Sequence, residues 1–258
     1  MGAKTIMPDP TLITFPPSLD CELGRFLLTH YQIPHTEQRH ALIFSSFATL
    51  WHGHTVHFPV LYGDSYRLGN VREMVDYFDP LSPADRRLLP DNDDPEQAKA
   101  DWAYFNNTLG TAASVFGYYH LLKHRDIMIN PLSDGAPEFE VVAVRVAYPV
   151  FAGLLRVLLR LTASHAESAL GEIRNAMKQV DERLKDGRPF LKGDHFSLSD
   201  MAFAVSAAPI IWPDEYGGKL PPLADTPPEI KNAVAEMREH PAGQFVLRIY
   251  RDRRTRRG

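Results

Sequence analysis

The sequence predicts two domains, a small α/β domain followed by an all-helical domain. Hydrophobic residues in the order strand, helix, strand, helix, strand, strand, helix occupy residues 10–80. No convincing strand follows in the helical pattern of residues 96–248. A proline-rich linker at residues 81–95 separates the two patterns, and a basic tail at residues 249–258 ends the chain.

The composition of the chain argues against several classes of function. A net charge of −4 argues against a nucleic-acid or membrane-surface binder. A single cysteine, Cys21, excludes an intrachain disulfide framework and a zinc site built from cysteines. Three arginines and Pro149 interrupt the longest apolar run, residues 141–161, which fits a buried or half-buried helix better than a membrane span. Without a signal-peptide pattern, we expect a cytoplasmic protein.

The first half of the α/β domain begins with a β-prone run at residues 11–15, which two prolines end. Ser18 then precedes a helical stripe of apolar residues that extends to Tyr31. A second strand at residues 35–38 and a second helix at residues 41–51 follow. This order predicts a small mixed sheet with helices on both faces.

The second half of the domain is a strand, a tight turn, a short strand and a helix within residues 56–78. The first strand carries Pro59 at its start, and proline in a strand marks an edge, a bulge or a cis bond. Gly63-Asp64 predicts a two-residue hairpin turn, because glycine supplies the positive φ that such turns need. The following strand occupies residues 65–68, and the helix begins near Asn70.

Ser18 and Cys21 are the first chemical candidates, because they lie where the first strand ends and the first helix begins. Free N–H groups and the helix dipole favour an anion at this point. A serine hydroxyl there can donate a hydrogen bond to a bound thiolate, and a cysteine there has a lowered pKa. The plainer alternatives are that Ser18 only caps the helix and that Cys21 only packs beneath it.

These patterns resemble glutathione S-transferases, which join a thioredoxin-like domain to an all-α domain. The first helix with its flanks, SLDCELGRFLLTHYQIP, aligns with the first helix of that family without gaps. The segment at residues 190–204, FLKGDHFSLSDMAFA, resembles the buried-helix motif of the family's C-terminal domain. Its Ser197 and Asp200 form a variant of the helix-capping box and are structural.

The resemblance implies site residues. Ser18 takes the position of the serine or cysteine that activates the glutathione thiol, and Cys21 is a neighbour with potential redox activity. Pro59 is the cis proline, and the backbone of Phe58 before it pairs with the cysteinyl part of glutathione. His57 can meet the glycyl carboxylate. Asn70 and Val71 stand where the family has a Glu/Gln-Ser pair for the γ-glutamyl end, and Val71 lacks the hydroxyl.

In the helical domain, periodicity predicts helices at residues 96–124, 138–164, 166–186, 199–210 and 228–239. Pro149 is expected to kink the second of these, and residues 125–137 to form a loop at a pocket rim. Tyr104 and Thr108, one turn apart on the first helix, are the pair expected to meet an apolar co-substrate.

The histidines do not form a recognisable metal motif. His52, His54 and His57 lie close in sequence without an acidic neighbour, and His120 and His124 are spaced as an exposed helical pair. We expect no metal. The arginine-rich tail is expected to be solvated, with a contact to nucleic acid or an acidic partner as the alternative.

The function implied by the resemblance is addition of glutathione, as co-substrate, to a small apolar electrophile. Two alternatives stay open, a non-catalytic binding protein of the same fold and a glutathione-dependent lyase, isomerase or reductase that uses Cys21. The resemblance also implies a homodimer. We expect no nucleic-acid or membrane partner.

Overall fold

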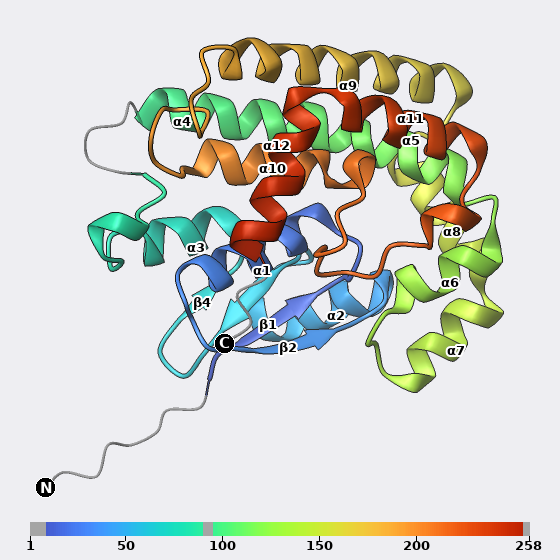
Figure 1. Ribbon diagram of the computed structural model, residues 1–258. Coiled ribbons are helices and arrows are strands. Elements are labelled where there is room, and N and C mark those ends of the chain that lie inside the picture. The colour runs from blue at the N-terminus through green and yellow to red at the C-terminus, as the bar shows by residue number, and fades with distance from the viewer. Residues whose placement is uncertain (1–8, 90–94, 255–258) are drawn as a thin grey trace, which may run out of the picture.

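The computed structural model describes residues 9–89 and 95–254, with a small sheet domain below a larger group of helices (Figure 1). The N-terminal elements are β1 (Thr11–Thr14), α1 (Leu19–His30), β2 (Thr36–Arg39), α2 (Leu42–Gly53), β3 (Val60–Tyr62), β4 (Arg67–Leu68), α3 (Val71–Phe78) and the 3-10 turn η1 (Ala84–Arg86). The later elements are α4 (Pro95–Ala103), the π-helical η2 (Tyr104–Gly110), α5 (Thr111–Leu121), α6 (Arg125–Ser133), α7 (Glu138–Val146), α8 (Tyr148–Leu158), α9 (Ala163–Leu184), α10 (Leu198–Ile211), η3 (Leu223–Asp225), α11 (Pro228–Glu239), α12 (Pro241–Ile249) and η4 (Tyr250–Arg254).

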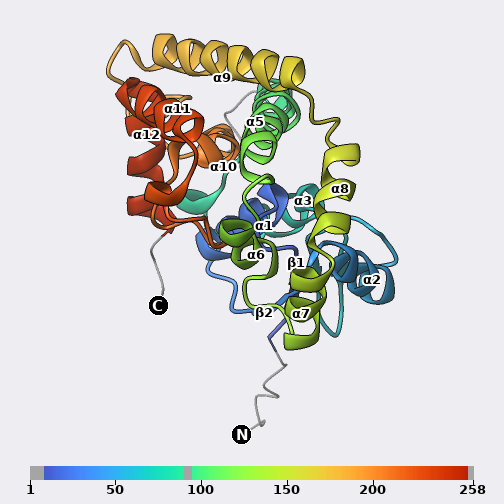
Figure 2. The ribbon, with the colours of Figure 1, turned by 90° about the vertical axis from the view of Figure 1, so that its right-hand side faces the viewer.

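The four strands form the predicted mixed sheet in the order β2-β1-β3-β4. β1 pairs with β2 in parallel and with β3 antiparallel, and β4 closes the sheet antiparallel to β3. α1 and α3 contact each other, and α1 also contacts the central helix α10, whereas α2 contacts β1 and β3. The sheet therefore has helices on both faces, with α1 between the sheet and the helical domain (Figure 2).

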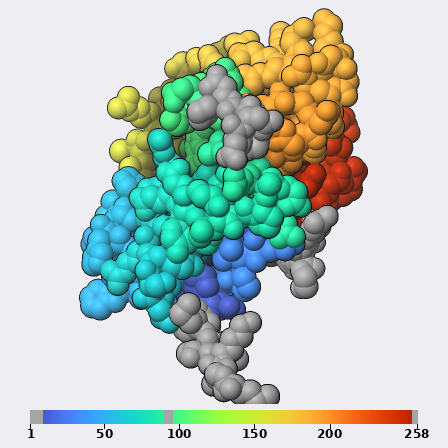
Figure 3. All heavy atoms as spheres, turned by 90° about the vertical axis from the view of Figure 1, so that its left-hand side faces the viewer, coloured from blue at the N-terminus to red at the C-terminus, as the bar shows by residue number. Residues whose placement is uncertain are grey.

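α10 is the centre of the helical domain. Nearly all of its side chains are buried, and Asp200 bonds both to Ser197 and to the backbone N–H of Leu191. This is the predicted capping box. Seen from the side of α3, the early residues occupy the lower half of the molecule and the later helices the upper half (Figure 3).

The hairpin differs from the predicted one in its turn. The N–H of Gly63 donates to the carbonyl of Tyr66 at 3.0 Å, so four residues connect the strands and β4 begins at Arg67. The predicted start of the next helix is correct, since Asn70 caps α3 and its side chain accepts from the N–H of Glu73.

Residues 125–137 were predicted to be a loop, but residues 125–133 form α6 despite Pro131 near its end. Met128, Ile129 and Leu132 are buried, so packing on neighbouring elements overrides the weak local helix signal. The long second helix is broken, as expected near Pro149, into α7 and α8, which meet at an angle of 81°. No single helix in the described residues is long and apolar enough to span a membrane, although this bent pair meets the length and composition limits together.

The tail was predicted to be solvated, yet its described part packs on the protein. η4 extends the chain to Arg254, whose Nε donates to Glu22 at 3.0 Å. Arg253 lies over the rings of Phe190 and Phe196. The end of the tail, residues 255–258, lies outside the described residues.

Most of the exposed large apolar side chains lie on α2, the segment after it, α7 and α8. We call this the apolar face and define it by Phe47, Leu50, Trp51, Val56, Phe139, Val142, Val146, Val150, Val157 and Leu158. They come from α2, the segment after it, α7 and α8.

Candidate functional site

A cleft of about 340 Å³ opens between the two domains. Its N-terminal wall includes Phe15, Pro17, Ser18, Leu19, Asp20, Leu42 and Phe58. Its helical wall includes Asn106, Asn107, Gly110, Thr111, Ser114, Tyr118, Leu155, Leu158 and Leu159. Polar groups from α1 and the η2–α5 segment thus line one space together with leucines from α2 and from the end of α8.

Ser18 lies at the edge of this cleft because β1 ends at a turn that leads directly into α1. Its N–H donates to the carbonyl of Phe15 at 3.0 Å, and its Oγ accepts from the N–H of Cys21 at 3.4 Å. The Ser18 hydroxyl therefore caps α1 as an acceptor, and a serine hydroxyl can also donate its proton. The first N–H groups of α1 add a positive potential at the same point.

Cys21, by contrast, is completely buried. Its Sγ accepts from the N–H of Phe15 at 3.3 Å. Burial raises the pKa of the thiol to about 12, although the charge of Arg25 and two hydrogen bonds act in the opposite direction. Cys21 is therefore a protonated thiol at neutral pH, which is the state of an inert structural cysteine.

The peptide bond between Phe58 and Pro59 is cis, as the resemblance implied. Phe58 lines the cleft and packs edge-on against Phe15, with ring centroids 5.6 Å apart. Pro59 is buried against α1, where a Cβ on Gly24 would lie only 3.0 Å from its Cγ. His57 is exposed, and its N–H donates to Thr55 Oγ1.

Asn70 and Val71 are occupied by local structure. Asn70 Oδ1 accepts from the N–H of Glu73 at 3.0 Å, and its Nδ2 donates to the Glu73 carboxylate at 2.6 Å. Val71 is buried in the core beside α1. The groups that the resemblance places at the γ-glutamyl end thus serve as a helix cap and a core contact.

Tyr104 and Thr108 are not among the described residues that line the cleft. The Tyr104 hydroxyl accepts instead from Gln179 on α9, at 3.0 Å. Asn106, Asn107 and Thr111 take the cleft-facing places. The π-helical turn at residues 104–110 explains the difference, because it shifts the register that a regular α-helix predicts. Sequence periodicity gives no signal for such a turn.

Asp20 is a cleft residue that sequence reasoning missed. Its carboxyl group is half-buried beside Ser18, and burial raises its pKa, while a hydrogen bond with Asn106 and the charge of His57 act in the opposite direction. In the sequence it reads only as an acid in the first turn of a helix. That position is explained by the helix dipole alone.

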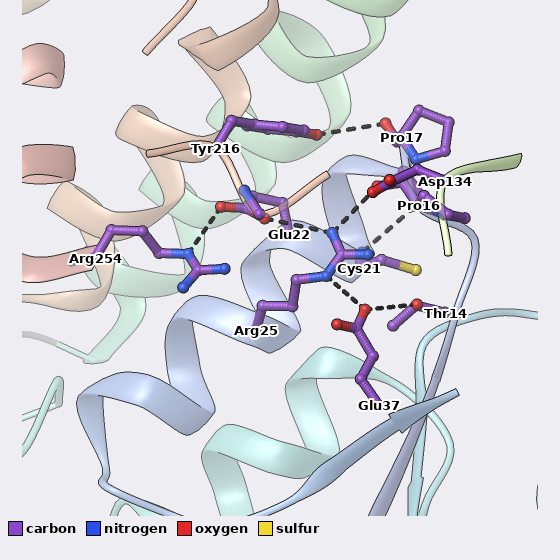
Figure 4. A network of polar contacts seen from close by, with 12 residues as sticks. Thr14, Pro16, Pro17, Cys21, Glu22, Arg25, Glu37, Asp134, Tyr216 and Arg254 are labelled. Carbon is purple, nitrogen blue, oxygen red and sulfur yellow. Dashed lines mark hydrogen bonds and ion pairs between the residues drawn. The ribbon is translucent and has the colours of Figure 1, made fainter. Parts of the chain in front are cut away.

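A buried charge network supports the helix that carries Ser18 (Figure 4). Glu22 is fully buried and accepts from Arg25, from Arg254 and from the N–H of Gly217. Arg25 also donates to Glu37 at 2.7 Å and to the carbonyl of Pro16 at 3.1 Å. The network ties α1 to the sheet, to the loop after α10 and to the C-terminal segment.

The histidines are dispersed in the structure. His52 stacks on Tyr62, His54 Nε2 lies 2.7 Å from Arg67, and His120 packs on Phe116. Within residues 9–89 and 95–254, no group of three or more His, Cys, Asp or Glu side chains is arranged to hold a metal ion.

Comparison with known proteins shows which family and which solved structures this chain resembles. Residues 160–241 match the family described as "Glutathione S-transferase, C-terminal domain". A glutathione S-transferase from Sinorhizobium meliloti 1021 superposes with a TM-score of 0.55 and 21% identity, over 97% of this chain and 95% of the other. A glutathione S-transferase from Methylobacillus flagellatus KT with glutathione bound gives a TM-score of 0.52 and 16% identity, over 92% and 98% of the two chains.

The β-etherase LigF from Sphingobium sp. strain SYK-6 gives a TM-score of 0.58 and 14% identity, over 93% of this chain and 99% of that one. No curated protein sequence matches the chain. The predicted glutathione S-transferase fold is therefore confirmed. The chain has that fold over almost its whole length, and residues 160–241 match the model of the family's C-terminal domain.

Proposed function

We propose that the protein is a glutathione transferase-like enzyme. In this proposal, Ser18 and the N-terminus of α1 hold the glutathione thiolate, which attacks a small electrophile in the cleft. The main observation in favour is that Ser18 lines the cleft at the N-terminus of α1, where its Oγ accepts from the N–H of Cys21. A hydroxyl proton and helix N–H groups aimed at one point stabilise a negative charge there.

The other predicted glutathione contacts stay part of the proposal. Phe58, before the cis bond, lies at the same edge of the cleft as Ser18, where its backbone is expected to align the cysteinyl part of glutathione. His57 is exposed next to it and is expected to meet the glycyl carboxylate. At the γ-glutamyl end, we expect contacts from the N-terminus of α3 and from the Asn70 amide, which already bonds to Glu73, so we expect modest affinity.

The cleft also refines the expected electrophile. Leu42, Leu155, Leu158 and Leu159 supply an apolar wall, as expected for an apolar co-substrate. Asp20, Asn106 and Asn107 supply polar groups to the same lining. An electrophile with an apolar body and a hydrogen-bonding group fits this lining better than a wholly apolar one.

A reductase that uses Cys21 is not supported, because the thiol is buried and protonated. A non-catalytic binding protein is the second candidate, and one observation favours it. Asn70 and Val71 are engaged in the cap and core of α3 rather than free for glutathione. A homodimer in the cytoplasm remains our expectation for either function.

The proposal is tested by Ser18→Ala and Ser18→Thr, with turnover measured on a panel of aromatic and alkyl electrophiles. Ser18→Ala removes the donor, and we expect kcat/KM to fall by about tenfold to a thousandfold, in the range of a lost electrostatic contact. Ser18→Thr keeps a hydroxyl and a cap, and we expect most of the activity to remain.

Thr162→Ala is the control for the effect of losing a helix cap. Thr162 caps α9 in the same way, by accepting from the N–H of His165 at 3.2 Å, and it is exposed. It should reproduce any stability loss of Ser18→Ala without the loss of turnover. Equal turnover in Ser18→Ala and the unmodified protein would contradict the role of Ser18.

A further inference from the structure

The apolar face is unusually concentrated. Of twelve exposed large apolar side chains in the described part of the chain, ten belong to it. Trp51 is 80% exposed, Val146 77% and Val157 75%. Single exposed apolar residues are normal, but a gathered set marks an interaction surface.

The helices that carry this face are held together by specific contacts. Phe44 of α2 meets Phe139 of α7 edge-on at 5.6 Å. The carboxylate of Glu140 accepts from the N–H of Ala41 at 2.8 Å and lies 2.7 Å from His40 Nδ1. α2, α7 and α8 accordingly lie along one side of the molecule (Figure 2). These contacts hold α2 and α7 against each other.

The charge on this side differs from that of the whole chain. Neither residues 40–63 nor residues 141–166 contain an Asp or Glu, although the net charge is −4. The second segment contains Arg145, Arg156 and Arg160, all of them exposed. None of these three forms an ion pair with another described residue. Glu138, at the first turn of α7, is an exposed acid near the edge of the face.

We propose that the apolar face binds the surface of an anionic lipid bilayer. Valine, leucine, phenylalanine and tryptophan side chains would enter the boundary between headgroups and acyl chains, and the three arginines would meet lipid phosphates. Helices that combine an apolar face with unpaired cations bind membranes in this way without spanning them.

A second copy of the chain fits this face less well. A two-fold contact would bring Arg145, Arg156 and Arg160 of both copies toward one interface, and residues 40–63 and 141–166 supply no acid to pair with them. An anionic bilayer instead supplies the opposite charge directly. The expectation that the protein does not bind a membrane surface followed from the net charge, which does not reflect this uneven distribution.

The face also adjoins the cleft. Leu158 is 61% exposed on the apolar face and lines the cleft as well, as does Leu42 at the start of α2. A bilayer on this face would therefore lie next to the cleft entrance. Binding itself does not depend on the proposed enzymatic function.

The test is co-sedimentation of the full-length protein with vesicles of phosphatidylcholine alone and of phosphatidylcholine with phosphatidylglycerol. We expect binding to the anionic vesicles, weakened at high salt, and little binding to the neutral ones. Trp51→Glu and Val157→Glu should each weaken binding by about tenfold or more, since each places a charge in the apolar boundary.

Leu81→Glu is the matched control, because Leu81 is 72% exposed but lies outside the apolar face, and we expect its binding to be unchanged. All three positions are exposed, so thermal unfolding should be unaffected, and this is checked first. Absence of binding to either vesicle, or equal binding of all variants, overturns the proposal. Light scattering tests the alternative that the face binds a second copy of the chain. A dimer that Trp51→Glu or Val157→Glu dissociates would overturn the proposal and support that alternative.

Discussion

At the residue scale, Ser18 and Cys21 lie three positions apart in the sequence but have different surroundings, and these decide which of them can meet a ligand. Both were candidates from the sequence, since both lie in the first turn of a helix after a strand. The structure leaves Ser18 at the cleft and buries Cys21 under it. Local pattern could not make this distinction, because the burial of Cys21 depends on contacts with residues far along the chain.

The buried thiol gives a pH prediction. The pKa of Cys21 is raised from 9.0 to about 12, so the folded state keeps a proton that the unfolded chain loses. This contribution to stability is complete below pH 9 and is lost as the pH rises toward 12. Denaturant titrations across this range should show stability falling less steeply in Cys21→Ala than in the unmodified protein. Rapid alkylation of Cys21 in the native protein at pH 7 would contradict it.

At the scale of elements, α2 lacks a side-chain cap of its own and receives one from α7. Glu140 is almost fully buried, and its carboxylate accepts from the N–H of Ala41 at the start of α2. Sequence patterns identified the helix at residues 41–51 but not this partner, which is about a hundred residues away.

Glu140→Ala should lower the free energy of unfolding by about 1–3 kcal/mol, because it leaves a buried N–H without an acceptor. Denaturant unfolding measures this loss. Glu138→Ala, on the exposed side of the same turn, should change stability by less than about 0.5 kcal/mol. Equal effects of the two substitutions would show that Glu140 does not cap α2.

The C-terminal segment makes a second connection between elements. Arg254 approaches the fully buried Glu22 at 3.0 Å, so its removal leaves part of a buried charge uncompensated. We expect Arg254→Met to destabilise the protein by about 1–3 kcal/mol. Arg251→Met, whose charge pairs with Asp252 at the surface, should have an effect near zero in the same thermal scans. If Arg254→Met were as stable as the unmodified protein, the contact between Arg254 and Glu22 would not stabilise the fold, as expected for a solvated tail.

At the scale of the whole molecule, the fold was predictable because its signals are local and repeated. Strand and helix periods, the Pro59 strand and the Ser197–Asp200 cap each specify their own segment, and together they match one known architecture. The division at residues 80 and 95 remains a prediction, although Asp79 binds the linker by accepting from the N–H groups of Leu88 and Leu89.

The cleft was less predictable than the fold. Its edge at Ser18 and Phe58 followed from the motifs, but its helical wall depends on the π-turn at residues 104–110 and on α8. The π-turn has no sequence signature, and the kink predicted at Pro149 did not show that α8 lines the cleft. Side chains were therefore assigned to the wall by a regular helical register that the molecule does not follow.

The central claim, that the cleft holds glutathione as a thiolate beside Ser18, is tested most directly by calorimetric titration of reduced glutathione at pH 7. The titration is run in two buffers of different ionisation enthalpy and repeated with an S-alkylated glutathione. We expect micromolar to low-millimolar binding and release of nearly one proton per reduced glutathione, because a free thiol has a pKa of about 8.5. The alkylated ligand should release none. Binding without proton release would contradict thiolate stabilisation, and no binding of either ligand would contradict the glutathione site.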